Sequence, residues 1–269
     1  MNDITIIIPV HKYNADIKEM LTKAFESVRQ NQENYTNGKL IPLVIAPDEV
    51  LEALGGDFGN KEFYKECRND SEKTDFCSQI NFAVKKGVDT DYFSILEFDD
   101  IYTENWFEMA RKYFITNESV SVFLPINIFT IGGSNEYMFA NDIVWSYTFT
   151  KDLGYIDFNV LQDYAGFNLT GGIFNTKDFK SVGGLKSNIK VAFNYEFLLR
   201  LTKKELKVFV VPKEGYIHTL NREDNLTDTY NKTLSGKEIE KWYQLAKTEY
   251  IYNEDRDVDI SNIKEEKLT

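Results

Sequence analysis

The chain has 269 residues, of which 42% are hydrophobic, and its 43 acidic and 31 basic residues give a formal net charge of −12. This composition supports a large hydrophobic core, and it opposes a function dominated by the DNA or RNA backbone, because no Lys/Arg-rich segment supplies counterion release. The two cysteines, Cys67 and Cys77, have no neighbouring His or further Cys to complete a zinc site, so we expect free thiols in a reducing compartment.

The sequence shows no segment typical of membrane insertion or secretion. No apolar run approaches the ~20 residues of a membrane helix. The first residues lack the basic start and longer apolar stretch of a signal peptide. We therefore expect a cytoplasmic protein, either free or peripheral at the inner membrane face.

The first half of the chain alternates strand and helix patterns. In chain order, the pattern predicts a strand at 4–10, a helix at 16–31 capped by Asp16, a strand at 40–46, a short helix at 49–54, irregular structure at 57–74, a helix at 76–86, a strand at 92–98, a helix at 104–114 and a strand at 120–126. This order predicts an α/β fold with a mostly parallel sheet covered by helices. Ligands of such sheets bind beyond the carboxyl ends of the strands.

The second half has a more mixed pattern. Residues 127–165 are aromatic-rich with weak periodicity and suggest antiparallel strands and loops. A helix is predicted at 193–202, a short strand at 208–211 ending at Pro212, a helix at 236–252 and a frayed, charged tail at 253–269. We expect one domain over 1–234, with a nucleotide-binding half (1–126) and an acceptor-binding half (127–234), followed by a C-terminal helix and tail (235–269).

Three carboxylates follow the predicted strand at 92–98. In a strand, alternate side chains share a face, so Glu97 and Asp99 should point the same way, with Asp100 beside them. Like charges at this spacing repel unless a cation lies between them. Carboxylate oxygens suit Mg²⁺ or Mn²⁺, and such an ion often binds the phosphates of a substrate as well. The cluster predicts a metal–nucleotide site, and a solvated acidic turn is the alternative.

Several motifs resemble those of glycosyltransferase family 2, which has the GT-A fold, and they follow the order of that family. They are Ile-Ile-Pro-Val-His-Lys-Tyr-Asn at 7–14, Phe-Glu-Ser-Val-Arg-Gln-Asn-Gln at 25–32, Asn81, Leu-Glu-Phe-Asp-Asp at 96–100, Thr-Gly-Gly-Ile-Phe at 170–174, Phe-x-x-Val-Gly-Gly-Leu at 179–185 and Glu-x-x-x-Arg-Leu at 196–201. The resemblance covers residues 3–226. It implies transfer of a sugar from a nucleotide-sugar, expected to be a UDP-sugar, with inversion at the anomeric carbon.

The resemblance also implies roles for individual residues. Asp99 would hold Mn²⁺ or Mg²⁺, with His218 completing the metal shell; a half-buried histidine bonded to the backbone is the alternative for His218. Arg222 would clamp the diphosphate, unless it belongs to a solvated charged loop. The residues expected to bind the nucleotide-sugar are Pro9, Val10, His11, Tyr13, Asp48, Asn81, Glu97, Phe98 and Arg222.

The chain departs from the family pattern at three places. Glu97 replaces the first aspartate of the acidic motif, and Ala46-Pro47 replace an Asp-Asp pair that reads the nucleoside, with Asp48 just beyond. Asn194 stands where the family has its catalytic aspartate, and an asparagine cannot act as a general base. The base candidates are therefore Glu196, which could equally be structural, and Asp163.

Other readings remain open from the sequence. The acceptor could be a glycan, a lipid-linked glycan, a protein or a modified nucleobase. The changes at Asn194 and Ala46-Pro47 favour, as the rival hypothesis, a GT-A-fold protein that binds nucleotide-sugars or glycans without turnover. A nucleotidyltransferase or phosphotransferase is disfavoured, because the sequence contains no Gly-rich phosphate loop. Trp106 and Trp145 are candidates for stacking on sugar rings, although Trp106 is more typical of a core and Arg200 of a structural salt bridge.

Overall fold

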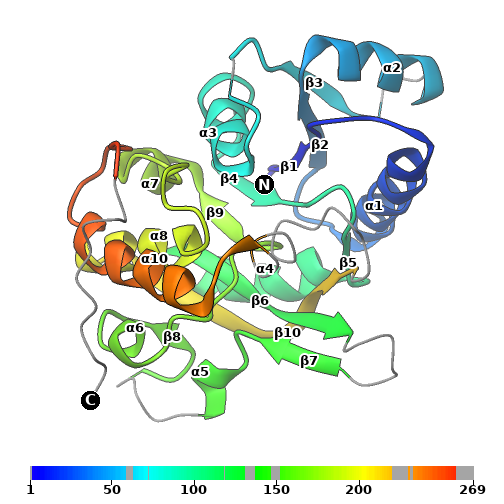
Figure 1. Cartoon of the computed structure of the whole chain (residues 1–269). Helices are drawn as coiled ribbons and strands as arrows, with labels where there is room; N and C mark the ends of the chain where they lie inside the picture. Colours follow the sequence, from blue (N-terminus) through cyan, green and yellow to red (C-terminus); the bar gives the residue numbers. More distant parts are fainter. Residues whose placement is uncertain are drawn as a thin grey trace.

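A computed structural model of the chain describes residues 2–58, 63–71, 73–117, 119–130, 137–146, 152–219, 230 and 233–258. Within these residues the protein is built on one ten-stranded sheet with helices on both faces (Figure 1). The main path of the sheet has the order β3-β2-β1-β4-β9-β6-β10-β5, with β7 on β6 and β8 on β10. The predicted α/β fold class is confirmed.

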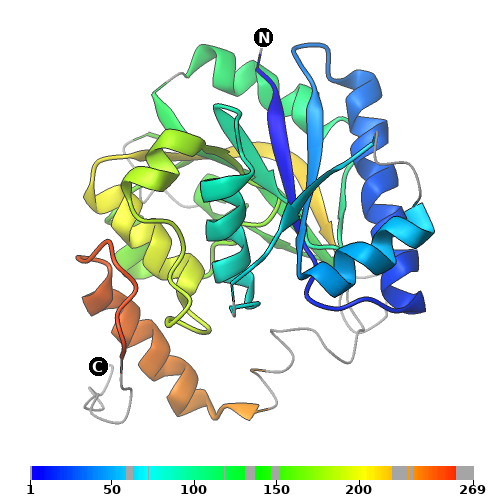
Figure 2. The ribbon, with the colours of Figure 1, turned by 90° about the horizontal axis from the view of Figure 1, so that it is seen from above.

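The first half forms the parallel part of the sheet. Its elements are β1 (Ile4–Pro9), α1 (Ala15–Asn34), β2 (Leu40–Ala46), α2 (Asp48–Phe58), β3 (Lys65–Arg68), α3 (Phe76–Lys86) and β4 (Tyr92–Ile95). Every residue of β1 is buried, and its alternate side chains enter two separate cores. Ile6 and Ile8 pack in the core that includes α1, and Ile7 packs in the core that includes α3. The two helices therefore cover opposite faces of the sheet (Figure 2).

The second half adds mixed strands and the remaining helices. Its elements are β5 (Ile101–Tyr102), α4 (Trp106–Thr116), β6 (Val120–Thr130), β7 (Tyr137–Ala140), α5 (Ile143–Ser146), β8 (Tyr155–Ile156), α6 (Val160–Asp163), β9 (Ile173–Asn175), α7 (Thr176–Ser181), α8 (Phe193–Lys203), β10 (Lys207–His218) and α10 (Gly236–Glu249). β9 is antiparallel to both β4 and β6, and β10 is parallel to β6. Consequently β1, β4, β6 and β10 all end at one edge of the sheet.

One strand end predicted from a proline is wrong. The strand predicted to stop at Pro212 continues to His218 as β10. The pairing of β10 with β6 shifts register between Val210 and Glu214, and this irregularity accommodates Pro212, which cannot donate a ladder hydrogen bond. β3 lies inside the segment predicted to be irregular, so that prediction was wrong for residues 65–68.

Several helix boundaries differ from the predicted ones. α1 begins one residue earlier than expected, because Asn14 and not Asp16 is its cap: the Asn14 side chain accepts a hydrogen bond from the Ile17 backbone N–H at 2.9 Å. α2 continues through Gly55-Gly56 to Phe58. None of the described helices is both long and apolar enough to cross a membrane.

The segment after α10 is tied to the body of the protein, so the predicted fraying is wrong for residues 253–258. Asp255 accepts hydrogen bonds from the Ser187 backbone N–H and hydroxyl at 3.1 and 2.6 Å and from the Asn188 N–H at 3.3 Å. Arg256 pairs with Glu249 at 2.7 Å. A Cβ on Gly183 would lie only 2.1 Å from the Asn253 carbonyl oxygen, so this glycine permits the close approach.

Replacing Asp255 with alanine should loosen the loop before α8. The change removes the acceptor of three hydrogen bonds, and we expect the local opening free energy to fall by about 1 kcal/mol. Hydrogen exchange measured by mass spectrometry should then be roughly 5-fold faster in the peptide that contains Ser187 and Asn188. Asp257→Ala is the matched control, since Asp257 makes none of these contacts; equal acceleration in both variants would contradict the assignment.

Candidate active site

The acidic residues lie in the loop that follows β4, at the edge where the parallel strands end. β4 ends at Ile95, three residues before the predicted end. Leu96 to Asp100 therefore leave the sheet, and the Asp100 N–H donates to the Glu97 carbonyl at 3.1 Å in a tight turn. The rule that alternate strand residues share a face no longer applies, and the turn brings Asp100 rather than Asp99 next to Glu97.

Glu97, Asp100 and His218 form a group that could hold a metal ion. One ligand atom of each lies within 4.8 Å of the others. His218 Nδ1 is 3.0 Å from Asp100 Oδ2, and Asp100 Oδ1 accepts a hydrogen bond from the Thr219 N–H at 2.8 Å. Asp99, the ligand predicted from sequence, is half-buried on the adjacent turn and is not in this group.

Tyr216 holds the acidic loop in place through a hydrogen bond. Its hydroxyl accepts a hydrogen bond from the Glu97 backbone N–H at 3.0 Å. Burial raises the pKa of Tyr216 well above its ordinary value, so the phenol stays protonated and neutral beside the carboxylates. Gly171, at φ +76°, lies against this ring, where a Cβ would come within 2.6 Å of Tyr216. The Thr170-Gly171-Gly172 motif thus packs directly under the site.

A set of amide side chains surrounds the other side of His218. Nε2 of His218 is 3.1 Å from Asn127 Nδ2, 3.2 Å from Asn168 Nδ2 and 3.3 Å from Thr170 Oγ1. The imidazole stacks on Phe129 with ring centroids 4.1 Å apart. Sequence reasoning missed Asn127 and Asn168, because single asparagines in an aromatic-rich segment form no pattern; the position of Asn168 just before Thr170-Gly171 was the only available signal.

The predicted nucleotide loop after β1 lies beside the acidic loop. The rings of His11 and Phe98 are 5.9 Å apart, so the structure brings these two predicted contacts together. Val10 is fully buried and His11 is exposed. The hydroxyl of Tyr13 donates to Asp57 at 2.8 Å, and this bond ties the loop to the end of α2.

Two other predicted nucleotide contacts have partners within the protein. Asp48 pairs with Arg68 at 3.0 Å on the surface of α2. Asn81 donates to the Leu185 carbonyl at 2.6 Å and accepts from its N–H at 2.8 Å, so its amide fastens α3 to the Gly183-Gly184 turn. This geometry favours a structural role for Asn81. Arg222 lies outside the described residues.

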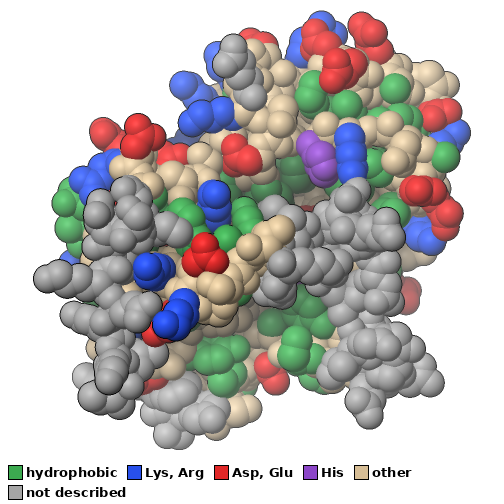
Figure 3. Space-filling view, in the orientation of Figure 1, with side chains coloured by type: hydrophobic (Ala, Val, Ile, Leu, Met, Phe, Trp, Pro, Cys, Tyr) green, Lys and Arg blue, Asp and Glu red, His purple; other side chains and the backbone are tan. Residues whose placement is uncertain are grey.

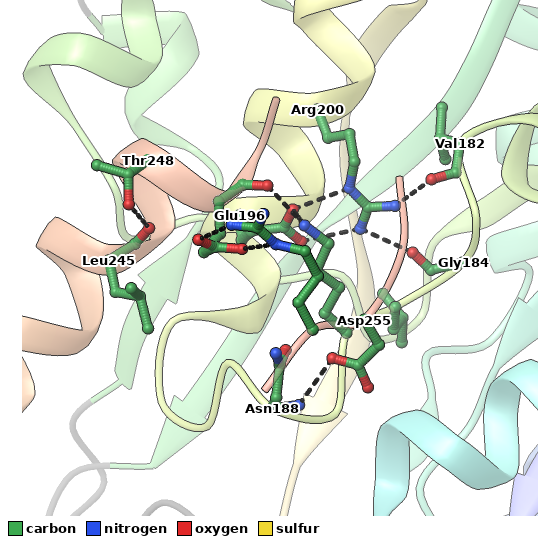
Figure 4. Close-up of polar contacts among 12 residues, drawn as sticks. Val182, Gly184, Asn188, Glu196, Arg200, Leu245, Thr248 and Asp255 are labelled. Carbon is green, nitrogen blue, oxygen red and sulfur yellow. Dashed lines mark hydrogen bonds and ion pairs between the residues drawn. The ribbon is translucent and has the colours of Figure 1, made fainter. Parts of the chain in front are cut away.

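Glu196, one of the two predicted bases, lies in a buried ion cluster on α8. Its carboxylate contacts Arg200 at 2.9 and 2.8 Å and Lys186 at 3.0 Å, and all three side chains are at most 1% exposed. Arg200 also donates to the Val182 and Gly184 carbonyls (Figure 4). Burial lowers the pKa of Lys186. Cations contact both carboxylate oxygens of Glu196, and the side chain has no exposed surface. This geometry favours a structural role for Glu196 over the role of general base.

The remaining sequence candidates have clear places. Asp163 is exposed at the end of α6, whereas Asn194 is half-buried at the start of α8. Trp106 is fully buried and donates to the Gly171 carbonyl at 3.0 Å, which is the core role; Trp145 packs edge-on against Phe209. On the face in Figure 3, described acidic and basic side chains are interspersed and gather into no broad basic area.

Comparison with solved structures shows that the chain has a glycosyltransferase fold. Among the similar structures are those of S. aureus TarS, a glycosyltransferase. The complex of TarS residues 1–349 with UDP has a TM-score of 0.60 at 14% identity, covering 97% of this chain and 68% of that one. The complex with UDP-GlcNAc has a TM-score of 0.63 at 13% identity, covering 97% and 69%. No protein-family model matches the chain, and no curated protein matches its sequence.

Proposed function

We propose that the protein is a metal-dependent, inverting glycosyltransferase that transfers a sugar from a UDP-sugar to a hydroxyl acceptor. The observation that carries the proposal is the group of Glu97, Asp100 and His218 at the carboxyl edge of the sheet, in a fold shared with TarS. Ligands bind at this edge in parallel α/β sheets. The TarS structures contain UDP or UDP-GlcNAc, which supports a uridine nucleotide as the donor here.

The residues present fit a divalent cation. Glu97 and Asp100 offer hard carboxylate oxygens at the same point, and such donors suit Mn²⁺ or Mg²⁺. A bound ion would supply positive charge that stabilises the diphosphate as it leaves. The hydrogen bonds from Tyr216 and Thr219 fix the acidic loop before any ligand arrives, so the carboxylates need little rearrangement to bind.

Residues of the protein are also candidates for binding the donor and for activating the acceptor. The contact between the rings of His11 and Phe98 supports a nucleoside site between the loop after β1 and the acidic loop. For the acceptor, Asp163 is the exposed member of the two predicted bases and is the one we propose to take the hydroxyl proton. The acceptor class remains that of a sugar, lipid-linked sugar, protein or base hydroxyl.

Thermal unfolding with and without ligands tests this function. UDP-GlcNAc with Mn²⁺ at about 100 times Kd should stabilise the protein by about 2.7 kcal/mol, and this should raise Tm by about 5 °C or more. ADP-GlcNAc, which differs from UDP-GlcNAc only in its base, is the matched control for the base, and EDTA is the control for the metal. Equal shifts with ADP-GlcNAc and UDP-GlcNAc would contradict a uridine-specific site.

The rival function predicts a different pair of results. A GT-A-fold protein that binds nucleotide-sugars without turnover should show the same Tm increase but no UDP release with any acceptor or with water. The changes at Asn194 and Ala46-Pro47 are the features that favour it. Asp163→Asn should abolish release while keeping the Tm increase if Asp163 is the base.

A further inference from the structure

Two amide groups point at the same nitrogen of His218. Asn127 Nδ2 lies 3.1 Å and Asn168 Nδ2 lies 3.2 Å from His218 Nε2. An amide nitrogen donates and an amide oxygen accepts, so the orientation of each amide decides what Nε2 must do. Each orientation is determined by contacts with backbone groups, whose donor or acceptor character is unambiguous.

Asn168 is oriented by Thr170. The Asn168 oxygen accepts from the Thr170 backbone N–H at 3.0 Å and from the Thr170 hydroxyl at 2.9 Å. A backbone N–H can only donate, so the oxygen of this amide must face Thr170. The nitrogen of Asn168 is therefore the atom that faces His218.

Asn127 is oriented in the same sense. Its nitrogen also lies 3.2 Å from the Thr170 carbonyl, which can only accept, and its oxygen is 3.3 Å from Asn141 Nδ2. Asn141 is itself held by backbone groups: it donates to the carbonyls of Pro125 and Asn168 and accepts from the Asn168 N–H. The whole network is buried or half-buried and presents N–H groups to His218.

The ring of His218 must match these donors. With N–H groups aimed at Nε2, that nitrogen accepts, and the proton of the neutral imidazole is on Nδ1. Nδ1 is 3.0 Å from Asp100 Oδ2, which accepts it. The stacking of His218 on Phe129, with planes 7° apart, holds the ring in this orientation.

This arrangement conflicts with metal binding through Nδ1. A histidine ligand normally donates its second ring N–H to an acceptor. Here Nε2 faces two donors, so a metal on Nδ1 would require both nitrogens to lack a proton. Among the described residues, the side-chain atoms within hydrogen-bond distance of Nε2 are two amide nitrogens and the Thr170 hydroxyl oxygen. Only this oxygen, at 3.3 Å, could accept a proton from Nε2, and the two amide N–H groups would still point at Nε2.

We propose that His218 is a positioning residue and not a metal ligand. Asn127 and Asn168 hold it in the Nδ1–H tautomer, and its Nδ1–H orients the Asp100 carboxylate, so that Glu97 and Asp100 are the protein ligands of the cation. This assignment rests on the proposed metal-dependent function, and it replaces the expectation that His218 completes the metal shell.

Nitrogen-15 NMR of the metal-free protein tests the tautomer without relying on activity. The chain has only two histidines, and a His11→Gln variant assigns their signals. In mildly alkaline buffer, His218 should show a pyrrole-type Nδ1 and a pyridine-type Nε2. Asn168→Asp places an acceptor opposite Nε2, and Nε2 should then become pyrrole-type. A pyrrole-type Nε2 in the unaltered protein would overturn the proposal.

Mn²⁺ bound to the full chain provides the second test. Electron spin-echo spectroscopy should detect no directly coordinated nitrogen. His218→Leu should weaken Mn²⁺ binding by about 10-fold to 100-fold, as for other residues that orient a metal ligand. His218→Asn, whose amide N–H can take the place of Nδ1–H, should restore the affinity. A nitrogen coupling, or an Asn variant as weak as Leu, would overturn the proposal.

The failure of this inference can be told from failure of the proposed function. If Mn²⁺ does not bind at all, the metal-dependent function fails, and the tautomer observed by NMR still decides the state of His218. If Mn²⁺ binds with a nitrogen ligand, the function stands and the positioning role is wrong.

Discussion

The Asp100→Asn protein is expected to lose Mn²⁺ binding and to release UDP from UDP-GlcNAc at least about 100-fold more slowly, the scale of losing one electrostatic contact to a transition state. Asparagine keeps the size of the side chain and an oxygen for the Thr219 N–H, but it removes the charge that would hold the cation and the second oxygen that accepts the His218 Nδ1–H. Calorimetry with Mn²⁺ and a UDP-release assay measure the two effects.

Asp99→Asn is the matched control, since it makes the same chemical change one residue away. The structure places Asp99 outside the group of Glu97, Asp100 and His218, so we expect a smaller effect on Mn²⁺ affinity. If Asp99→Asn abolishes binding and Asp100→Asn spares it, the sequence-based choice of Asp99 as ligand is correct. Thermal unfolding of both variants shows whether either change acts through the fold.

The Glu196→Gln protein is expected to lose about 3–5 kcal/mol of stability, the cost of leaving buried charges without their partner. Lys186 and Arg200 would remain in the interior without a counter-charge. Urea unfolding should show a lower midpoint, and any loss of turnover should follow the unfolded fraction.

Glu19→Gln is the matched control for this change. Glu19 also pairs with a lysine, Lys23 at 2.7 Å, but both side chains are largely exposed on α1. Solvent screens such a pair, so little change in the unfolding midpoint is expected. If Glu196→Gln instead unfolds like the unaltered protein and yet loses turnover, Glu196 is the base and not a structural residue.

The sequence predicts β1, β2 and β4 well, because these strands are almost entirely buried and appear as apolar runs. It misses β3, whose side chains are mostly exposed and form no such run. It fails at Pro212, which was taken as the end of a strand, whereas Pro47 does follow the end of β2. β10 passes Pro212 because a register shift removes the need for its N–H, and that shift depends on the partner strand β6, which no local pattern encodes.

Only part of the site could be predicted, because its geometry also depends on contacts between segments that lie far apart in the sequence. The acidic segment and His218 are visible as residue types, and the structure brings them together. The choice between Asp99 and Asp100 depends on where β4 ends, and the pattern extends it three residues too far. The amides around His218 come from β6, from the segment after β7 and from the segment before β9, so only the folded sheet brings them together.

The register shift also determines which residue of β10 faces the acidic loop. Residues 210 to 216 of β10 run alongside only residues 124 to 127 of β6. Side chains alternate faces along a strand, so deleting one residue between Pro212 and Gly215 would exchange the directions of Ile217 and His218. The length of this segment, and not only its composition, is therefore part of what specifies the site.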